Sequence, residues 1–136
     1  MEGCRFVLIK LFGAIDDKSL SDIITSHAKK TQGIPDMKEL IDCRDVTNLD
    51  ELTVHGVRNT ANHLGNKPEW LLALLINDNP MLQGMAEGYR VSTVEQRKDV
   101  KVFTELKEAI SWIAQDKDEL SSINTFINEG AESLKL

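Results

Sequence analysis

The sequence predicts one α/β domain: a mostly parallel, mixed sheet of four to five strands with helices packed against it. Three observations support this fold class. Apolar segments of strand length alternate along the chain with segments in which apolar residues recur at helical spacing. The connections between the apolar segments are too long for hairpins, and crossovers of that length join parallel strands. Residues 70–76 are apolar at every position, as expected of a strand covered by helices on both faces.

The chain begins with a predicted strand and a predicted helix. Residues 5–15 are rich in Val, Ile, Leu and Phe, which is typical of a strand. Asp16 and Asp17 follow directly and offer an N-cap. The helix that they start has its apolar face at Leu20, Ile23, Ile24, His27 and Ala28.

A second strand and helix come next. Residues 33–36 form a turn cluster, and residues 38–46 form the second strand. Asp50 is expected to cap the following helix. The apolar stripe of this helix ends at Gly65 and consists of Val54, Val57, Ala61 and Leu64.

The strand at 70–76 leads into a helix with a clear start signal. Asn79 is the expected N-cap, and Pro80 takes the first helical position. Gly84 and Gly88 have the spacing of residues that allow close helix approach, and we interpret them as contacts of this helix with the sheet. The inward residues of this helix are predicted to be Met81, Leu82, Met85 and Tyr89.

The last part of the chain contains a short strand and two helical segments. Residues 99–103 form the strand, and Thr104 is expected to cap a helix with Leu106, Ala109, Ile110 and Ile113 facing inward. Residues 1–115 therefore form the domain. Residues 116–136 are an additional amphipathic tail that packs on this domain or on a second copy, through Leu120, Ile123, Phe126 and Ile127.

Composition and charge exclude several classes of protein. The chain of 136 residues carries a formal net charge of -6, so it lacks the basic surface on which nucleic-acid binders rely. Its apolar runs are too short to span a membrane. Cys4 and Cys43 are far apart and show no disulfide or metal-ligand spacing, which favours a cytoplasmic protein with reduced thiols. We expect no cofactor.

Three stretches of the sequence resemble the STAS superfamily, the fold of bacterial anti-sigma-factor antagonists, and within it the SpoIIAA-like branch of small stand-alone proteins. Residues 11–16 resemble the family's hydrophobic-Gly-x-hydrophobic-Asp turn before the first helix. Residues 41–46, followed by Asp50, are similar to the strand that precedes its switch helix. The last helix–strand–helix unit is similar at residues 83–86, 100–103 and 108–113.

The resemblance implies a regulatory protein that acts through protein–protein contact. Family members carry a phosphorylatable Ser directly after an Asp at the start of the switch helix, and this chain has Asp50-Glu51 there, so the acceptor hydroxyl is missing. Glu51 supplies a permanent negative charge at a helix N-terminus, where the dipole favours it. The alternative is that acidic residues are simply common in first helical turns. Thr47 and Thr53 are either substitute acceptors or caps.

No arrangement of residues in the sequence indicates an enzyme. Nucleophile-elbow, phosphate-loop and dinucleotide motifs are absent. His27, His55 and His63 lack metal-ligand spacing, so we expect solvated or cap-contacting histidines and no metal. Cys43 lies in a predicted core strand, where thiols are normally inert.

Acidic residues also gather around the end of the second strand. Asp42, Asp45, Asp50 and Glu51 could act as acid–base groups or bind a hard cation, but loop carboxylates are usually solvated. Without a second set of ligands, solvation is the simpler interpretation.

The sequence therefore predicts a non-enzymatic, cytosolic STAS-like interaction domain that lacks the phosphoacceptor Ser. Its partner is an unidentified protein, and self-association is left open. The predicted partner surface consists of Asp50, Glu51, Thr53, Val54 and Arg58. The alternative is a binder of a small apolar ligand or lipid at the carboxyl ends of the strands, where open α/β sheets bind ligands. The rim of that cleft would be formed by Arg44, Asp45, Asn77 and Asn79.

Overall fold

A computed structural model describes residues 6–34, 36–62, 67–114 and 116–128 of the chain. Its sheet has four strands, all parallel, in the order β1-β2-β3-β4. The strands are β1 (Phe6–Ala14), β2 (Lys38–Asn48), β3 (Lys67–Leu75) and β4 (Arg97–Phe103). The helices are α1 (Asp17–Lys30), α2 (Val54–Asn62), α3 (Pro80–Thr93), α4 (Leu106–Ile113) and α5 (Lys117–Asn128), with a 3-10 turn at Val94–Gln96. The predicted α/β class is confirmed.

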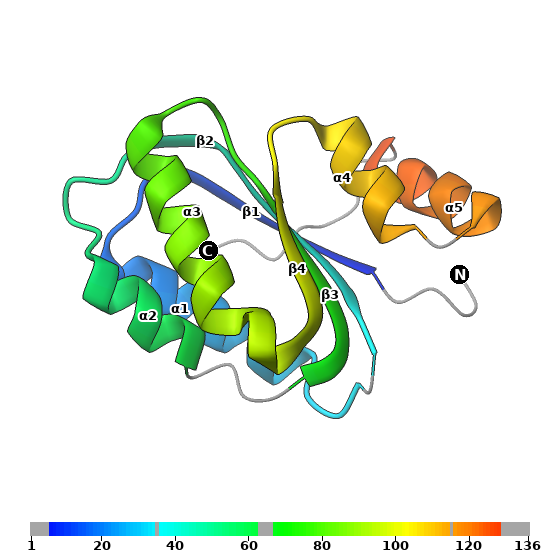
Figure 1. Cartoon of the computed structure of the whole chain (residues 1–136), viewed down its shortest axis with the longest axis horizontal. Helices are drawn as coiled ribbons and strands as arrows, with labels where there is room; N and C mark the ends of the chain where they lie inside the picture. The colour runs from blue at the N-terminus through cyan, green and yellow to red at the C-terminus, as the bar shows by residue number, and fades with distance from the viewer. Residues whose placement is uncertain (1–5, 35, 63–66, 115, 129–136) are drawn as a thin grey trace.

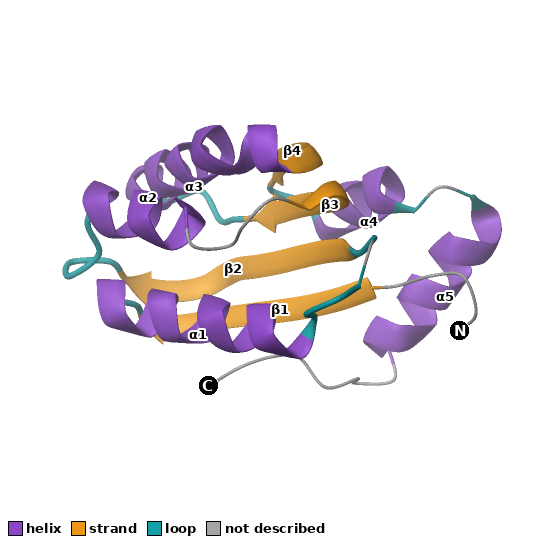
Figure 2. Cartoon of the chain, turned by 90° about the horizontal axis from the view of Figure 1, so that it is seen from below, coloured by secondary structure: helices purple, strands orange, loops and turns teal. Residues whose placement is uncertain are grey.

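The helices form two layers, one on each face of the sheet. The strand order advances in one direction, so right-handed crossovers place α1, α2 and α3 on the same face. Figure 1 shows these three helices on one side of the sheet and α4 and α5 on the other. In Figure 2, seen from below, α1, α2 and α3 lie toward the left and α4 and α5 toward the right. No helix in the described ranges has both the length and the apolar character needed to cross a bilayer.

The strand β3 contributes to both hydrophobic cores. Leu72 and Leu74 face α1–α3, whereas Ala73 and Leu75 face α4 and α5. All four side chains are at most 3% exposed. The all-apolar run in the sequence therefore corresponds to a strand buried on both faces, as predicted.

The second core includes the segment beyond residue 115. Ile123 of α5 is fully buried against this face of the sheet. Phe126 meets Phe6 of β1 edge to face, with ring centroids 5.5 Å apart. Lys38 of β2 and Glu119 of α5 form an ion pair in which both side chains are mostly buried. The helix α5 is thus packed on the sheet of its own chain.

Two of the predicted helix caps are confirmed and two are wrong. The Asp16 carboxylate accepts the backbone N–H of Ser19, and Asn79 caps α3 with Pro80 at its start. Asp50 does not cap α2, because the helix begins three residues later than expected, after Thr53. The N-cap position of α4 is Glu105 rather than Thr104, and its side chain makes no capping bond. The start of α2 involves a tertiary contact between Thr53 and Asp17, which short-range patterns do not encode.

Several residues expected to pack inward lie at the surface. Val54 and Met81 are 53% and 50% exposed. Gly84 does not contact the sheet, because a Cβ atom built there, or at Gly88, would meet nothing within 4 Å. The interpretation of the two glycines as helix–sheet contacts is therefore wrong. The predicted stripe residue Leu64 lies outside the described ranges.

Candidate functional site

The start of α2 is fixed by a set of hydrogen bonds from α1. The Asp17 carboxylate accepts the Thr53 backbone N–H (Oδ1···N 2.8 Å) and the Thr53 hydroxyl (Oδ2···Oγ1 2.7 Å). The same hydroxyl oxygen accepts the Gly56 N–H at 2.9 Å, which makes Thr53 the N-cap. A Cβ atom at Gly56 would lie 2.2 Å from the Asp17 carboxyl, so the contact requires glycine. We call Asp17, Thr53 and Gly56 the α2 clasp.

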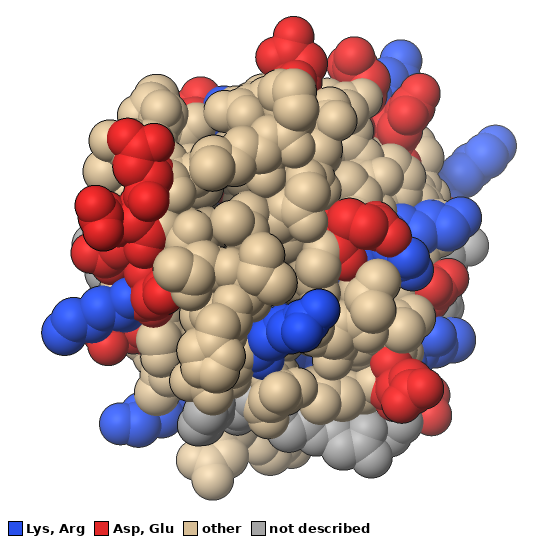
Figure 3. Space-filling view, turned by 60° about the vertical axis from the view of Figure 1, so that its left-hand side comes forward, with Lys and Arg blue, Asp and Glu red and all other residues tan. Residues whose placement is uncertain are grey.

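The other predicted partner residues lie on the surface around the clasp. Asp50, Glu51 and Arg58 are exposed, and Val54 projects from the first turn of α2. The Asp50 backbone N–H donates to the Asn48 side chain at 2.9 Å, which orders the acidic turn. Figure 3 shows this end of the molecule: acidic side chains gather along one flank, and a broad area without charge lies beside them.

The predicted ligand-rim residues are engaged in contacts within the protein. Arg44 binds Asp42 through two side-chain bonds of 3.0 and 2.9 Å, and these hydrogen bonds raise the pKa of the Arg44 guanidinium. The Asn77 amide donates to the Arg44 carbonyl (3.0 Å), and its oxygen accepts the Asn79 N–H (2.9 Å). Asn79 in turn accepts the Met81 N–H as the α3 cap.

The acidic group seen in the sequence is divided in the structure. Asp42 is buried in its pair with Arg44, and Asp45 forms a surface ion pair with Lys10 (Nζ···Oδ2 3.2 Å). Asp50 and Glu51 lie in the exposed turn before α2. Among the residues that the structure describes, no group of three or more His, Cys, Asp or Glu side chains could hold a metal ion.

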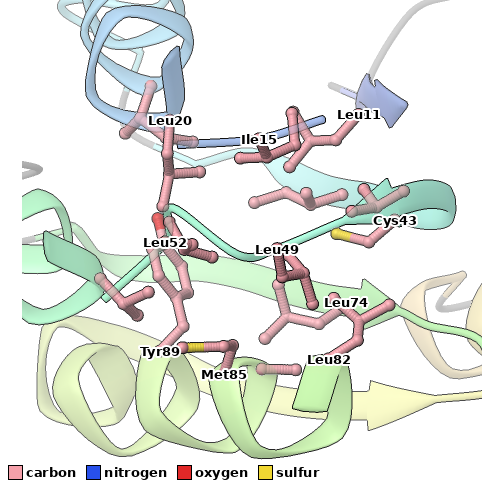
Figure 4. A pocket seen from close by; sticks show the side chains of 15 residues that line it. Leu11, Ile15, Leu20, Cys43, Leu49, Leu52, Leu74, Leu82, Met85 and Tyr89 are labelled. Atoms are coloured by element: carbon pink, nitrogen blue, oxygen red, sulfur yellow. The ribbon is translucent and has the colours of Figure 1, made fainter. Parts of the chain in front are cut away.

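An apolar cavity of about 60 Å³ lies behind the acidic turn, between the sheet and α1–α3 (Figure 4). Leu49 and Leu52, which flank Asp50 and Glu51, form part of its wall. Cys43 also lines the cavity, and burial raises the pKa of its thiol to about 12, so the thiol stays protonated and unreactive at neutral pH. The prediction of a buried, inert Cys43 agrees with this environment.

A buried charged cluster at the amino ends of the strands was missed by the sequence interpretation. Glu39 of β2 accepts Arg97 Nε at 3.1 Å through one oxygen and meets His27 Nε2 at 2.9 Å through the other. All three residues are at most 5% exposed. Trp70 packs beside them, with the Arg97 guanidinium carbon 5.6 Å from its ring centroid. The expectation of a solvated or cap-contacting His27 is wrong, because its ring lies in the core.

One signal in the sequence could have indicated this cluster. Glu39 stands in a strand next to Leu40 and Ile41, and His27 lies on the apolar face of α1. A buried carboxylate requires a partner, and His27 is one that the pattern could have offered. Arg97 carries no such signal, because it reaches Glu39 only through the β3–β4 pairing across 58 residues of sequence.

Comparisons with known proteins found no relative of this chain. No protein-family model, no curated protein and no solved structure matches the chain.

Proposed function

We propose that this chain is a non-enzymatic, cytoplasmic protein-interaction domain of the STAS type, and that it binds a protein partner through the start of α2. The observation that carries the proposal is Val54: an apolar side chain, 53% exposed, on the first turn of a helix that the α2 clasp holds in place. A partner that covers Val54 would remove this apolar side chain from water, and apolar contacts of that kind form the buried centre of protein–protein interfaces.

The rigidity of the α2 clasp supports this role. Binding costs free energy for every side chain and loop that must be ordered in the complex. Thr53 is fixed by bonds to Asp17 and Gly56, and the preceding turn is fixed by Asn48. The surface around Val54 is therefore ordered before a partner arrives, and less of the binding free energy is lost.

The charges around Val54 indicate the chemistry of the partner. Asp50 and Glu51 precede α2 and are exposed, so a partner with Lys or Arg beside an apolar contact would complement them. Glu51 stands where the STAS resemblance expects the phosphoacceptor, and it supplies its negative charge without a kinase. The Thr53 hydroxyl is already hydrogen-bonded on both sides, which favours its role as a cap over that of an acceptor.

The alternative function, an apolar ligand or lipid held by the predicted rim, has less support. The rim side chains of Arg44, Asn77 and Asn79 are hydrogen-bonded within the protein, and Asp45 is paired with Lys10. Each of these contacts would have to break before the side chain could turn toward a ligand in this position.

Site-specific photo-crosslinking tests the proposed surface with a matched pair of positions. Val54 and Val91 are both exposed valines, 53% and 60%, but Val91 lies on α3 away from the clasp. A benzophenone amino acid at position 54 should give a discrete crosslinked protein band in cells of the source organism, and the same group at position 91 should not.

A charge reversal then distinguishes specific binding at this surface from nonspecific association. Glu51→Arg should abolish the crosslink at position 54, because it places a positive charge where the partner is expected to carry its own. Glu95→Arg, at another exposed position, in the 3-10 turn, serves as the control and should leave the band unchanged. Equal crosslinks from positions 54 and 91, or a band that survives Glu51→Arg, would remove the start of α2 from the proposal.

A further inference from the structure

The cavity behind the acidic turn has walls that are almost wholly apolar. Fifteen of the described residues line it, from all three helices of this face and from strands β1, β2 and β3. Most of them are Leu, Ile, Val, Met or Ala; the exceptions are Cys43 and Tyr89. Natural cores contain few voids larger than a water molecule, so an apolar space of this size requires an explanation.

Tyr89 brings a buried hydroxyl group to the wall of this apolar space. The side chain is 6% exposed, and its hydroxyl has no hydrogen-bond partner among the described residues. Figure 4 shows the ring rising from α3, with the oxygen directed toward Leu20 and Leu52. Burial raises the pKa of this phenol, so it remains a neutral O–H donor. A buried donor without an acceptor costs about 1–3 kcal/mol.

Water is a poor occupant for this space. An ordered internal water makes about three hydrogen bonds, and apolar cavities remain dry. Among the described lining residues, only Tyr89, Cys43 and Met85 have an oxygen or sulfur atom in the side chain, and thiol and thioether sulfurs form weak hydrogen bonds. A charged molecule is excluded because its desolvation would not be offset. The remaining class is a neutral, mainly apolar molecule with one strong acceptor.

We propose that this cavity is a binding site for a small, neutral, mainly apolar molecule that accepts a hydrogen bond from the Tyr89 hydroxyl. The site is separate from the interaction surface proposed above and does not depend on it. A carbonyl or ether oxygen would satisfy the hydroxyl, and the hydrocarbon part would contact the leucine side chains of the wall.

The volume of the cavity limits the size of the ligand. About 60 Å³ is less than half of the roughly 150 Å³ cavity that takes up benzene. Met85 is the wall residue best able to enlarge it, because it is only partly buried and has an unbranched, flexible side chain. An outward turn of Met85 would lengthen the cavity toward the surface without moving the backbone. Short-chain ketones are therefore suitable probes.

The test compares two probes of the same shape that differ in one acceptor. Butanone and 2-methyl-1-butene are titrated into the isotope-labelled protein, and methyl shifts are followed by NMR. Both should shift the methyl groups of Leu49, Leu52 and Leu74, which line the cavity. Tyr89→Phe should weaken the binding of butanone about three- to tenfold, which is the effect of one hydrogen bond. The affinity for the alkene should not change.

Stability measurements give a second, independent result. Since the Tyr89 hydroxyl has no hydrogen-bond partner in the part of the chain that the structure describes, Tyr89→Phe should raise the urea midpoint of the ligand-free protein. The control is Thr31→Val, which removes a buried hydroxyl that donates to the His27 carbonyl at 2.9 Å. This change should lower the urea midpoint and leave the affinity for butanone unchanged. The proposal is wrong if butanone leaves the cavity methyl groups unshifted, if Tyr89→Phe weakens both probes equally, or if Tyr89→Phe destabilises the free protein.

Discussion

Glu39 has the environment that depends most on its partners. Its carboxylate is buried at the amino end of β2, between a guanidinium from β4 and an imidazole from α1. Removing a carboxylate from water costs several kcal/mol, which the partners offset only while the geometry is complete. The cluster therefore contributes little net stability, but it strongly disfavours arrangements in which β4 or α1 is displaced.

Replacing Glu39 should expose this dependence. Glu39→Gln keeps the shape of the side chain and removes the charge that offsets Arg97, so we expect a loss of about 3–5 kcal/mol in the free energy of unfolding. Glu39→Gln combined with Arg97→Met should lose less than the sum of the two single changes. The measurement is urea unfolding, with the exposed Glu95→Gln as a near-neutral control. Strict additivity would show that the two side chains are not coupled.

Cys43 makes stability depend on pH in the alkaline range. Its thiol has a pKa of about 12 in the folded protein against a reference value of 9.0, and burial is the main cause. Above pH 9 the unfolded chain loses this proton while the folded chain keeps it. The contribution of the buried thiol to the free energy of unfolding is therefore complete below pH 9 and is lost as the pH rises toward 12. Between pH 10 and 11 the wild type should lose about 1.4 kcal/mol more than Cys43→Ala. Equal pH slopes in urea unfolding would contradict the burial argument.

The helices α2 and α3 each contain a glycine whose substitution should have opposite effects. In α2, a Cβ at Gly56 would displace the Asp17 carboxylate and break the clasp. In α3, Gly84 faces open space, and alanine there only removes the flexibility of the unfolded chain. We expect Gly56→Ala to destabilise by about 1–2 kcal/mol and Gly84→Ala to stabilise by about 0.5–1 kcal/mol.

A second variant identifies the cause of the Gly56 effect. In an Asp17→Ala background the carboxylate that blocks the methyl group is gone, so Gly56→Ala should become neutral or stabilising in thermal unfolding. If Gly56→Ala costs the same with and without Asp17, the clasp is not the reason for glycine at this position.

The order and type of the elements were predictable because they follow from periodicity. The central strand was identified from a run without a polar residue, and the α3 start from an Asn-Pro pair whose roles are local. The start of α2 was not predictable, since its cap is completed by Asp17, 36 residues earlier in the chain. The outward position of Val54 follows from that start and was missed for the same reason.

The candidate sites differ in how far they could be predicted. The end of the sheet at which the proposed partner surface lies follows from parallel topology, so the sequence indicated it. The cavity could not be predicted, because it is a gap left where side chains from six elements meet, and hydrophobic patterning does not encode such gaps. The position of the Tyr89 hydroxyl, away from any hydrogen-bond partner in the described ranges, depends on the same packing.

The sheet joins two cores, and β3 contributes side chains to both. The molecule should therefore unfold as one unit, although its two faces have separate clusters. Each face has its own fluorescent reporter: Trp70 lies beside His27 of α1, and Trp112 of α4 packs on Phe103. Tertiary coupling through the shared strands should give both reporters the same unfolding midpoint.

Ile123→Ala tests this cooperativity, because Ile123 is fully buried under α5 and lies on the face opposite Trp70. We expect a loss of about 2–5 kcal/mol, as for other buried Ile→Ala changes. In Trp112→Phe and Trp70→Phe backgrounds, which leave one reporter each, Ile123→Ala should lower the urea midpoint of Trp70 and of Trp112 by the same free energy. The corresponding background protein with Ile123 intact is the control. A shift confined to Trp112 would mean that the α4–α5 layer unfolds separately and that the shared strand β3 does not couple the two faces.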